Sequence, residues 1–130
     1  MIEDRLRRLW TAAVILLAGA IAVGSLVPQP VVPVETWSDK VAHYLAYLSL
    51  ALLGSGISPP ERLARAILRC FVFGAVIELA QAAATAERAA EWGDLAANSA
   101  GILTAWLIAG GGRAGWAYRA AAWWSNRRSS

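Results

Sequence analysis

Charged residues are scarce in this chain of 130 residues, since Asp, Glu, Lys and Arg make up 16% of it, against roughly 25% in ordinary soluble domains. Cysteine is almost absent, because Cys70 stands alone. A single cysteine excludes an intrachain disulfide and argues against a metal cluster held by cysteines. Neither an internal repeat nor a low-complexity segment is present. The sequence therefore does not describe a disulfide-stabilised secreted domain or a repeat protein.

Apolar residues take the place of the missing charges. They make up 58% of the chain, and the mean hydropathy is +0.46. They fall in long blocks without the period of an amphipathic helix or strand. The net charge of +3 does not indicate a nucleic-acid partner, because the arginines flank apolar blocks instead of gathering in one cluster. The composition is typical of a membrane protein of a single domain.

The apolar blocks predict an all-α membrane protein with a bundle of four transmembrane helices. A helix that crosses the hydrocarbon core needs about 20 mostly apolar residues, and backbone groups in lipid must bond within their own segment. The predicted spans cover about 9–27, 41–57, 66–86 and 95–112, within a membrane domain of residues 1–112. Residues 113–130 form a basic, Trp-rich cytoplasmic tail, which either binds anionic lipids as a surface helix or is a frayed end.

Lysine and arginine predict the orientation of these spans. Ten of the twelve such residues fall at the N-terminus, in the second connection or in the tail. The other two, Lys40 and Arg88, lie in the first and third connections, among five acidic residues. Positive residues favour the cytoplasmic side. Both termini should therefore be cytoplasmic, in a multi-pass protein of the bacterial inner membrane.

A second interpretation of the first apolar block stays open. The basic start, the apolar run and the Ala20–Ala22 triplet also resemble a cleaved signal peptide. The uncharged run from Leu9 to Val27 is longer than the usual apolar region of about 7–15 residues. Cleavage would leave three spans in place of four.

Polar residues from distant parts of the chain map to the outer half of the predicted membrane. Asp39, His43 and Tyr47 are spaced four apart, so they share one face of a helix. Asp94 and Asn98 form a second stripe. Three helices thus turn polar faces toward one predicted outward-facing pocket, whose members are Asp39, Lys40, His43, Tyr47, Glu78, Gln81, Arg88, Asp94 and Asn98.

Glu78 is the most informative of these residues. On the predicted span it lies about 12 Å from the outer end, at about 1.5 Å per residue. An acidic group at such depth costs at least about 2.5–3.5 kcal/mol and usually faces a partner inside the protein. The available partners are Lys40, His43 and Arg88.

Small residues recur every four positions in the last span, from Gly93 through Gly101 to Ala109. This spacing lets helix backbones approach closely. We expect this face to pack on the second or third span, and to place Asn98 at the edge of the pocket.

Each polar feature also has a purely structural interpretation. Asp39 and Asp94 fit the first turn of a helix, where a negative charge is favourable. Lys40 and Arg88 could extend to the membrane surface. Glu78 fits a structural ion pair, and Asn98 an interhelical hydrogen bond.

The polar residues also carry a family resemblance. The stretch "SDKVAHYLAYLSLALLG", followed by "IELAQ" and "RAAEWGDLAANSAG", resembles the VanZ-like family of bacterial membrane proteins. The match covers about half of the chain. Ala86 and Glu87 stand where members of the family often carry a Pro-Gly turn. The resemblance implies a protein of the cell envelope, in a family whose founding member gives low-level resistance to the glycopeptide teicoplanin, and it names no reaction.

The leading hypothesis is a site that binds or processes a lipid-linked anionic envelope precursor. Lys40, His43 and Arg88 would hold the phosphate charge, while Asp39, Tyr47, Gln81 and Asn98 complete the binding surface. His43, Glu78 and Asp94 are the candidates for acid–base catalysis. No nucleophile motif, cofactor or metal signature is evident, so the sequence leaves open whether the chain is an enzyme.

Two further hypotheses stay open. The first is a non-enzymatic scaffold or partner, in which the polar residues form a structural network. The second is a small transporter or flippase subunit, which would require a homo-oligomer, because four short spans do not enclose a complete path.

Overall fold

The computed structural model describes residues 2–27, 37–84 and 92–128, and every regular element in these ranges is helical. The helices are α1 (Ile2–Leu26), α2 (Trp37–Gly56), α3 (Leu63–Ala84), α4 (Trp92–Gly110) and α5 (Trp116–Arg128). A short 3-10 turn, η1 (Pro60–Arg62), precedes α3. The prediction of an all-α chain is confirmed.

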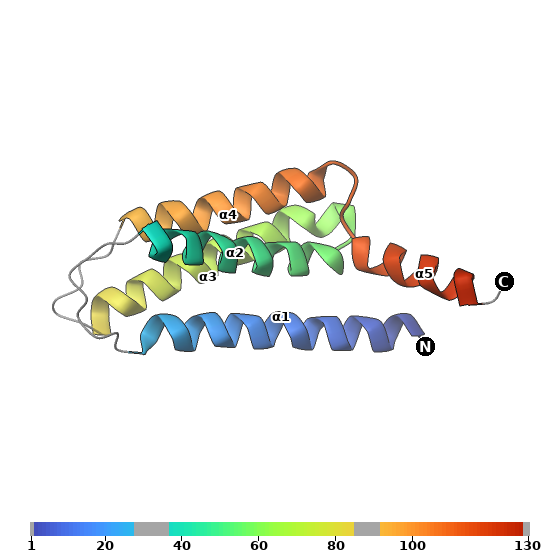
Figure 1. Cartoon of the computed structure of the whole chain (residues 1–130), viewed down its shortest axis with the longest axis horizontal. Helices are drawn as coiled ribbons and strands as arrows, with labels where there is room; N and C mark the ends of the chain where they lie inside the picture. Colours follow the sequence, from blue (N-terminus) through green and yellow to red (C-terminus); the bar gives the residue numbers. More distant parts are fainter. Residues whose placement is uncertain (1, 28–36, 85–91, 129–130) are drawn as a thin grey trace.

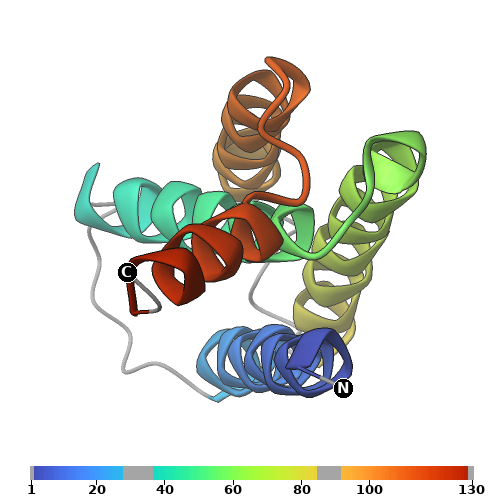
Figure 2. The same cartoon turned by 90° about the vertical axis from the view of Figure 1, so that its right-hand side faces the viewer.

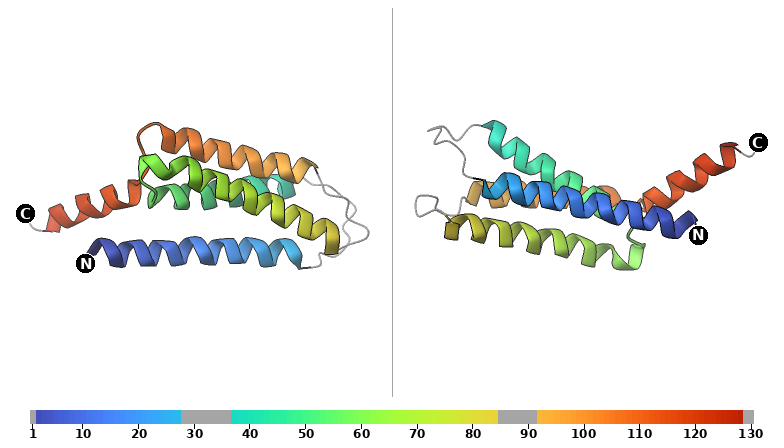
Figure 3. Two further views of the ribbon diagram at one scale, coloured as in Figure 1. Left: turned by 180° about the vertical axis from the view of Figure 1, so that it is seen from behind. Right: turned by 90° about the horizontal axis from the view of Figure 1, so that it is seen from below.

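Helices α1 to α4 run side by side in alternating directions, while α5 extends beyond the bundle (Figures 1 and 3). Viewed from the end that carries α5, α2 lies in the middle, with α4, α3 and α1 around it (Figure 2). One end of the bundle therefore holds the starts of α2 and α4, and the other holds the starts of α1 and α3. We call them the acidic end and the basic end, after the side chains described below.

The closest packing in the bundle is between α2 and α4. A Cβ atom on Gly101 would collide with the carbonyl oxygen of Tyr44 and lie 2.9 Å from the backbone nitrogen of Leu48. Ala105 and Ala109 continue the same face of α4 and are fully buried. The prediction that the small-residue face packs on a neighbouring helix is confirmed, and the neighbour is α2.

The remaining core lies where α3 and α1 cover this pair. Leu50, Ile67 and Ile102 are buried in it. Cys70 is also buried, as expected of a small packing residue. Helix α1 adds only partly buried side chains, such as Leu17 and Ile21. It is therefore the most peripheral of the four bundle helices.

Turns rich in glycine and proline define the helix ends at the basic end. Helix α2 stops at Gly56, and Pro60 opens η1. Beyond α4, Gly112 and Gly115 adopt positive φ angles of 82° and 71°, which glycine tolerates without steric cost. The turn is tied to α2 by a hydrogen bond from the Gly115 N–H to the Ser55 carbonyl, 2.9 Å long.

Two tryptophans fasten α1 and α5 to the end of α2. Trp10 donates to the Leu53 carbonyl at 2.9 Å, and Trp116 donates to the Leu52 carbonyl at 3.1 Å. Their rings meet edge to face, 5.2 Å apart. A Cβ atom on Gly56 would lie 3.0 Å from the Trp116 ring, so this glycine makes room for the indoles.

Among the described helices, α1 is the one that meets the criteria of length and apolarity for a membrane span, over Asp4–Leu26. The mean hydropathy there is 2.1, and 6% of the scored window is buried in the bundle. A signal sequence would satisfy the same test, so both interpretations of this segment stand. Helices α2, α3 and α4 fall outside these criteria, and their crossing of a membrane stays a prediction.

Candidate functional site

Polar side chains gather at the acidic end of the bundle, where α2 and α4 begin beside the C-terminal half of α3 (Figure 1). We use "polar cluster" for the six that contact one another through the interactions described below. They are Asp39, Lys40, His43, Glu78, Asp94 and Asn98. All six belong to the predicted pocket, so residues far apart in the sequence do meet in space.

Lys40 joins the two aspartates of the cluster. Its Nζ lies 2.5 Å from Asp94 Oδ1 and 3.8 Å from Asp39 Oδ2. Gly93 leaves room beside α4 for the aliphatic part of the Lys40 side chain. A Cβ atom at position 93 would lie 3.0 Å from Lys40 Cε. The Asp94 carboxylate is buried, with 6% of its side chain exposed, so the ammonium offsets most of the cost of desolvating it.

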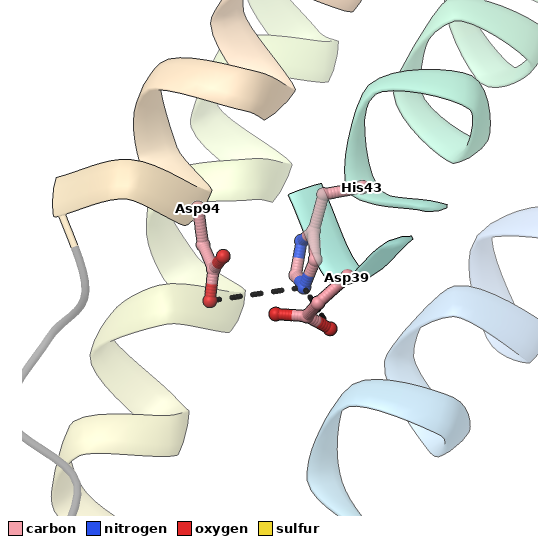
Figure 4. A group of neighbouring side chains, drawn as sticks. All are labelled: Asp39, His43 and Asp94. Atoms are coloured by element: carbon pink, nitrogen blue, oxygen red, sulfur yellow. Dashed lines mark ion pairs between the residues drawn. The ribbon is translucent and has the colours of Figure 1, made fainter. Parts of the chain in front are cut away.

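His43 faces the other oxygen of each aspartate (Figure 4). Its Nε2 lies 3.9 Å from Asp39 Oδ1 and 3.8 Å from Asp94 Oδ2. The exposed fraction of the side chain is 44% for Asp39, 16% for His43 and 6% for Asp94. The group is therefore open to the outside on the Asp39 side and closed on the Asp94 side.

Asn98 connects the histidine to the buried glutamate of α3. His43 Nδ1 lies 3.0 Å from Asn98 Oδ1, and Asn98 Nδ2 donates to Glu78 Oε1 at 3.3 Å. Because Asn98 Nδ2 donates to the Glu78 carboxylate, the atom that faces His43 is Asn98 Oδ1, which can only accept a hydrogen bond. His43 Nδ1 therefore carries the proton, and in the neutral ring the Nε2 lone pair points toward the aspartates.

One partner of Glu78, Asn98, is a residue that the sequence analysis did not assign to it. Glu78 is buried, as its predicted depth required, and Asn98 donates to it. Asn98 is 1% exposed and lies between His43 and Glu78. The expectation that it sits at the edge of the pocket is wrong, because the close approach of α4 to α2 turns it inward.

Two further members of the predicted pocket, Tyr47 and Gln81, make other contacts. Tyr47 is buried against Gly74 of α3, and among the described residues its hydroxyl has no hydrogen-bond partner. Gln81 donates to the Ser25 carbonyl at the end of α1, 2.7 Å away, so it fastens α1 to α3. Arg88 lies outside the described residues, as does the Ala86–Glu87 pair.

The sequence analysis also did not anticipate a pocket at the opposite end. This cavity, of about 230 Å³, lies in the turn between α2 and α3. Arg62, Arg65 and Arg69 line it together with Ser58 and Pro59. The i, i+3, i+7 spacing of the three arginines was the signal for their shared face. The pocket is far from the polar cluster along the bundle, so the two form separate sites.

The chain was compared with protein-family models, with curated proteins and with solved structures, and nothing matched. The resemblance to the VanZ-like family therefore stays a prediction carried by the quoted residues.

Proposed function

We propose that the chain is a multi-pass membrane protein of the bacterial envelope, whose polar cluster binds the head group of a lipid-linked anionic precursor. In this proposal α1 to α4 cross the bilayer, and the acidic end faces outward. Large apolar side chains on three of these helices point away from the bundle and support this placement. Leu16, Leu79 and Leu107 are 73%, 68% and 79% exposed. Such side chains suit contact with lipid.

The separation of charge between the two ends supports the orientation. The ten predicted cytoplasmic arginines all belong to described helices and turns around the basic end, on α1, η1, α3 or the α4–α5 region. Positive residues near span ends favour the cytoplasmic side. A reporter that is fluorescent only in the cytoplasm, fused after Arg128, should therefore fluoresce. A dark but expressed fusion would contradict the orientation.

The functional part of the proposal rests on one observation, the burial of two acidic side chains of the polar cluster. Glu78 and Asp94 are 6% and 4% exposed, on two different helices. At the depth of Glu78 an acidic group would cost at least about 2.5–3.5 kcal/mol within a membrane, and such residues typically mark a functional site. Both connect to His43, Asp94 by facing Nε2 and Glu78 through Asn98. In this proposal the two acids orient His43 toward the open side of the cluster, where the head group binds.

Lipid binding by the purified protein tests the proposal. Polyprenyl phosphate should bind to the protein in nanodiscs more tightly than uncharged polyprenol of the same length. The double variant His43→Ala with Glu78→Gln should lose this preference. Tyr44→Phe is the matched control, because it breaks a hydrogen bond between α2 and α4 outside the cluster, from Tyr44 to Thr104. Equal binding of both lipids by the wild-type protein would contradict the proposal.

The tight pairing inside the cluster favours a second candidate function, a non-enzymatic scaffold. Lys40 is held by Asp94, and Asn98 bridges His43 and Glu78, as in a purely structural network. In that case Glu78→Gln should lower the thermal stability of the protein, while the surviving folded fraction keeps its envelope phenotype. Loss of the phenotype at unchanged stability would instead favour the binding site.

A further inference from the structure

The space between His43 and the two aspartates has the dimensions of a metal site. The distances of 3.8 and 3.9 Å from His43 Nε2 are too long for hydrogen bonds, which span about 2.7–3.2 Å. One ligand atom from each of Asp39, His43 and Asp94 lies within 4.8 Å of the others. Zinc with four ligands about 2.1 Å away sets those ligands about 3.4 Å apart. A small inward shift would therefore close the three side chains around one ion (Figure 4).

Two of the three ligand groups, Asp94 and His43, are held by a second partner, and the third, Asp39, lies 3.8 Å from Lys40. Lys40 contacts Asp94 Oδ1 and Asp39 Oδ2, which leaves Asp94 Oδ2 and Asp39 Oδ1 turned to the histidine. Asn98 accepts from His43 Nδ1, which leaves the Nε2 lone pair directed at the same point. Outer partners of this kind, which fix the tautomer and the ring orientation, are typical of histidine ligands in metal sites.

Among the described residues of the site, acidic groups outnumber cations, which favours the binding of a metal ion. The described cluster carries three carboxylates, on Asp39, Glu78 and Asp94, against the single ammonium of Lys40. That ammonium is already 2.5 Å from Asp94. A phosphate would be repelled by this surplus of negative charge. A divalent ion between Asp39, His43 and Asp94 would cancel this surplus and place a positive centre at the open side of the site.

The ligand types select the class of ion. One imidazole nitrogen with two carboxylate oxygens suits zinc or manganese better than magnesium or calcium, which favour oxygen ligands throughout. Three protein ligands leave a fourth position open. Asp39 is the most exposed ligand, so this position faces the outside, where a water molecule or a phosphate oxygen can enter.

We propose that Asp39, His43 and Asp94 bind a divalent transition-metal ion, zinc first among them, whose open position accepts a phosphate oxygen of the precursor. The ion site follows from the geometry alone, while the phosphate contact rests on the proposed function.

Zinc binding by the metal-free protein in detergent tests the first part, by calorimetry and elemental analysis. We expect one zinc per chain, and loss of affinity by at least 100-fold in Asp39→Asn and in His43→Ala. Asn98→Ala should weaken zinc by about 10–100-fold, as removal of an outer partner does. Asp39→Asn is the decisive variant, because this side chain is the most exposed ligand and its loss leaves the Lys40–Asp94 pair intact.

Asp4→Asn is the matched control, since it removes an exposed carboxylate at the basic end and should leave zinc affinity unchanged. Zinc that binds equally well to Asp39→Asn and His43→Ala would overturn the site. The absence of binding by both zinc and manganese would overturn it as well. Tighter binding of magnesium than of zinc would overturn the assignment to a transition metal, because it would show that the histidine nitrogen is not a ligand.

Polyprenyl phosphate binding with and without a chelator tests the second part. Removal of zinc should weaken this binding at least tenfold and leave the binding of polyprenol unchanged. If zinc binds at the three residues but the chelator has no effect on polyprenyl phosphate, the ion site stands and its contact with phosphate is refuted. If the zinc-loaded protein binds neither lipid, the ion site again stands and the proposed function fails.

Discussion

The two ends of the bundle differ in how deeply their charged side chains are buried. At the acidic end, carboxylates on α3 and α4 are buried and paired, as Glu78 and Asp94 show. At the basic end, the charges stay on the surface. The pair between Arg7 and Asp4 is 3.3 Å long, with side chains 63% and 61% exposed.

The difference shows what each end contributes. A buried ion pair loses several kcal/mol when one partner is removed, whereas an exposed pair contributes about 0–1 kcal/mol. The charges at the acidic end therefore determine local structure and chemistry. Those at the basic end act through their number and sign, which set the orientation in a membrane and the attraction to anionic lipid.

The largest effect should come from separating the helices that build the polar cluster. In Gly101→Ala the new Cβ atom collides with the Tyr44 carbonyl oxygen, and backbone atoms cannot move aside as a flexible side chain can. We expect a loss of at least about 3 kcal/mol, the upper end of the usual cost of overpacking. Unfolding in mixed detergent micelles measures it.

Gly54→Ala, toward the basic end of α2, is the control for this change, because nothing lies within 4 Å of its added Cβ atom. It should be neutral or stabilise the helix by up to about 1 kcal/mol. Equal losses in the two variants would show that the close approach of α2 and α4 does not set the cost.

The second effect sharpens the contrast between buried and exposed pairs. Asp94→Asn removes the carboxylate closest to the Lys40 ammonium within the cluster. The Asp39 carboxylate, 3.8 Å from Lys40 Nζ, remains. We expect a loss of about 2–3 kcal/mol, below the about 3–5 kcal/mol of a fully buried pair, because the Lys40 side chain is 22% exposed. The same unfolding assay applies. A loss below 1 kcal/mol would place this pair with the surface pairs of the basic end.

Two tyrosines of α2 provide a matched comparison within the bundle. Tyr44→Phe removes the hydrogen bond to Thr104, 3.1 Å long, and should cost about 1 kcal/mol. Tyr47→Phe removes a buried hydroxyl without a hydrogen-bond partner among the described residues, so it should cost nothing or stabilise the protein. A larger loss in Tyr47→Phe than in Tyr44→Phe would show that the Tyr47 hydroxyl has a partner in solution.

The smallest effect is expected at the basic end. Arg7→Ala breaks an exposed i, i+3 pair, so the free energy of unfolding should change by less than about 0.5 kcal/mol. The small change should disappear in high salt, because exposed charges are screened. A loss comparable to that of Asp94→Asn would remove the distinction between the two ends.

The sequence predicted the elements of the bundle better than their contacts. The apolar blocks located all four helices, because the length and polarity of a segment determine whether it can form an apolar helix. The four-residue spacing of Asp39 and His43 placed both on one face of α2, because a helix repeats nearly every four residues. Both inferences use local geometry, and the structure agrees with both.

The side-chain contacts between helices could not be predicted from the spacing of residues within one helix. That Asp94 meets Lys40, and that Asn98 separates His43 from Glu78, depends on how far α4 slides along α2. That offset follows from the fit of Gly93 and Gly101 against particular atoms of α2, which no spacing within one helix encodes. For this reason the sequence offered candidate partners for Glu78 without Asn98, and offered no metal ligands.

The tryptophan contact at the basic end has a consequence for how the protein is made. Trp116 must reach the end of α2 before it and Trp10 can pack together over Gly56. A ribosome releases Trp116 only after α4 has been synthesised. The edge-to-face contact of the two indoles is therefore one of the last to form, whereas the hydrogen bonds from Trp10 to Leu53 and from Gln81 to Ser25 can hold α1 earlier.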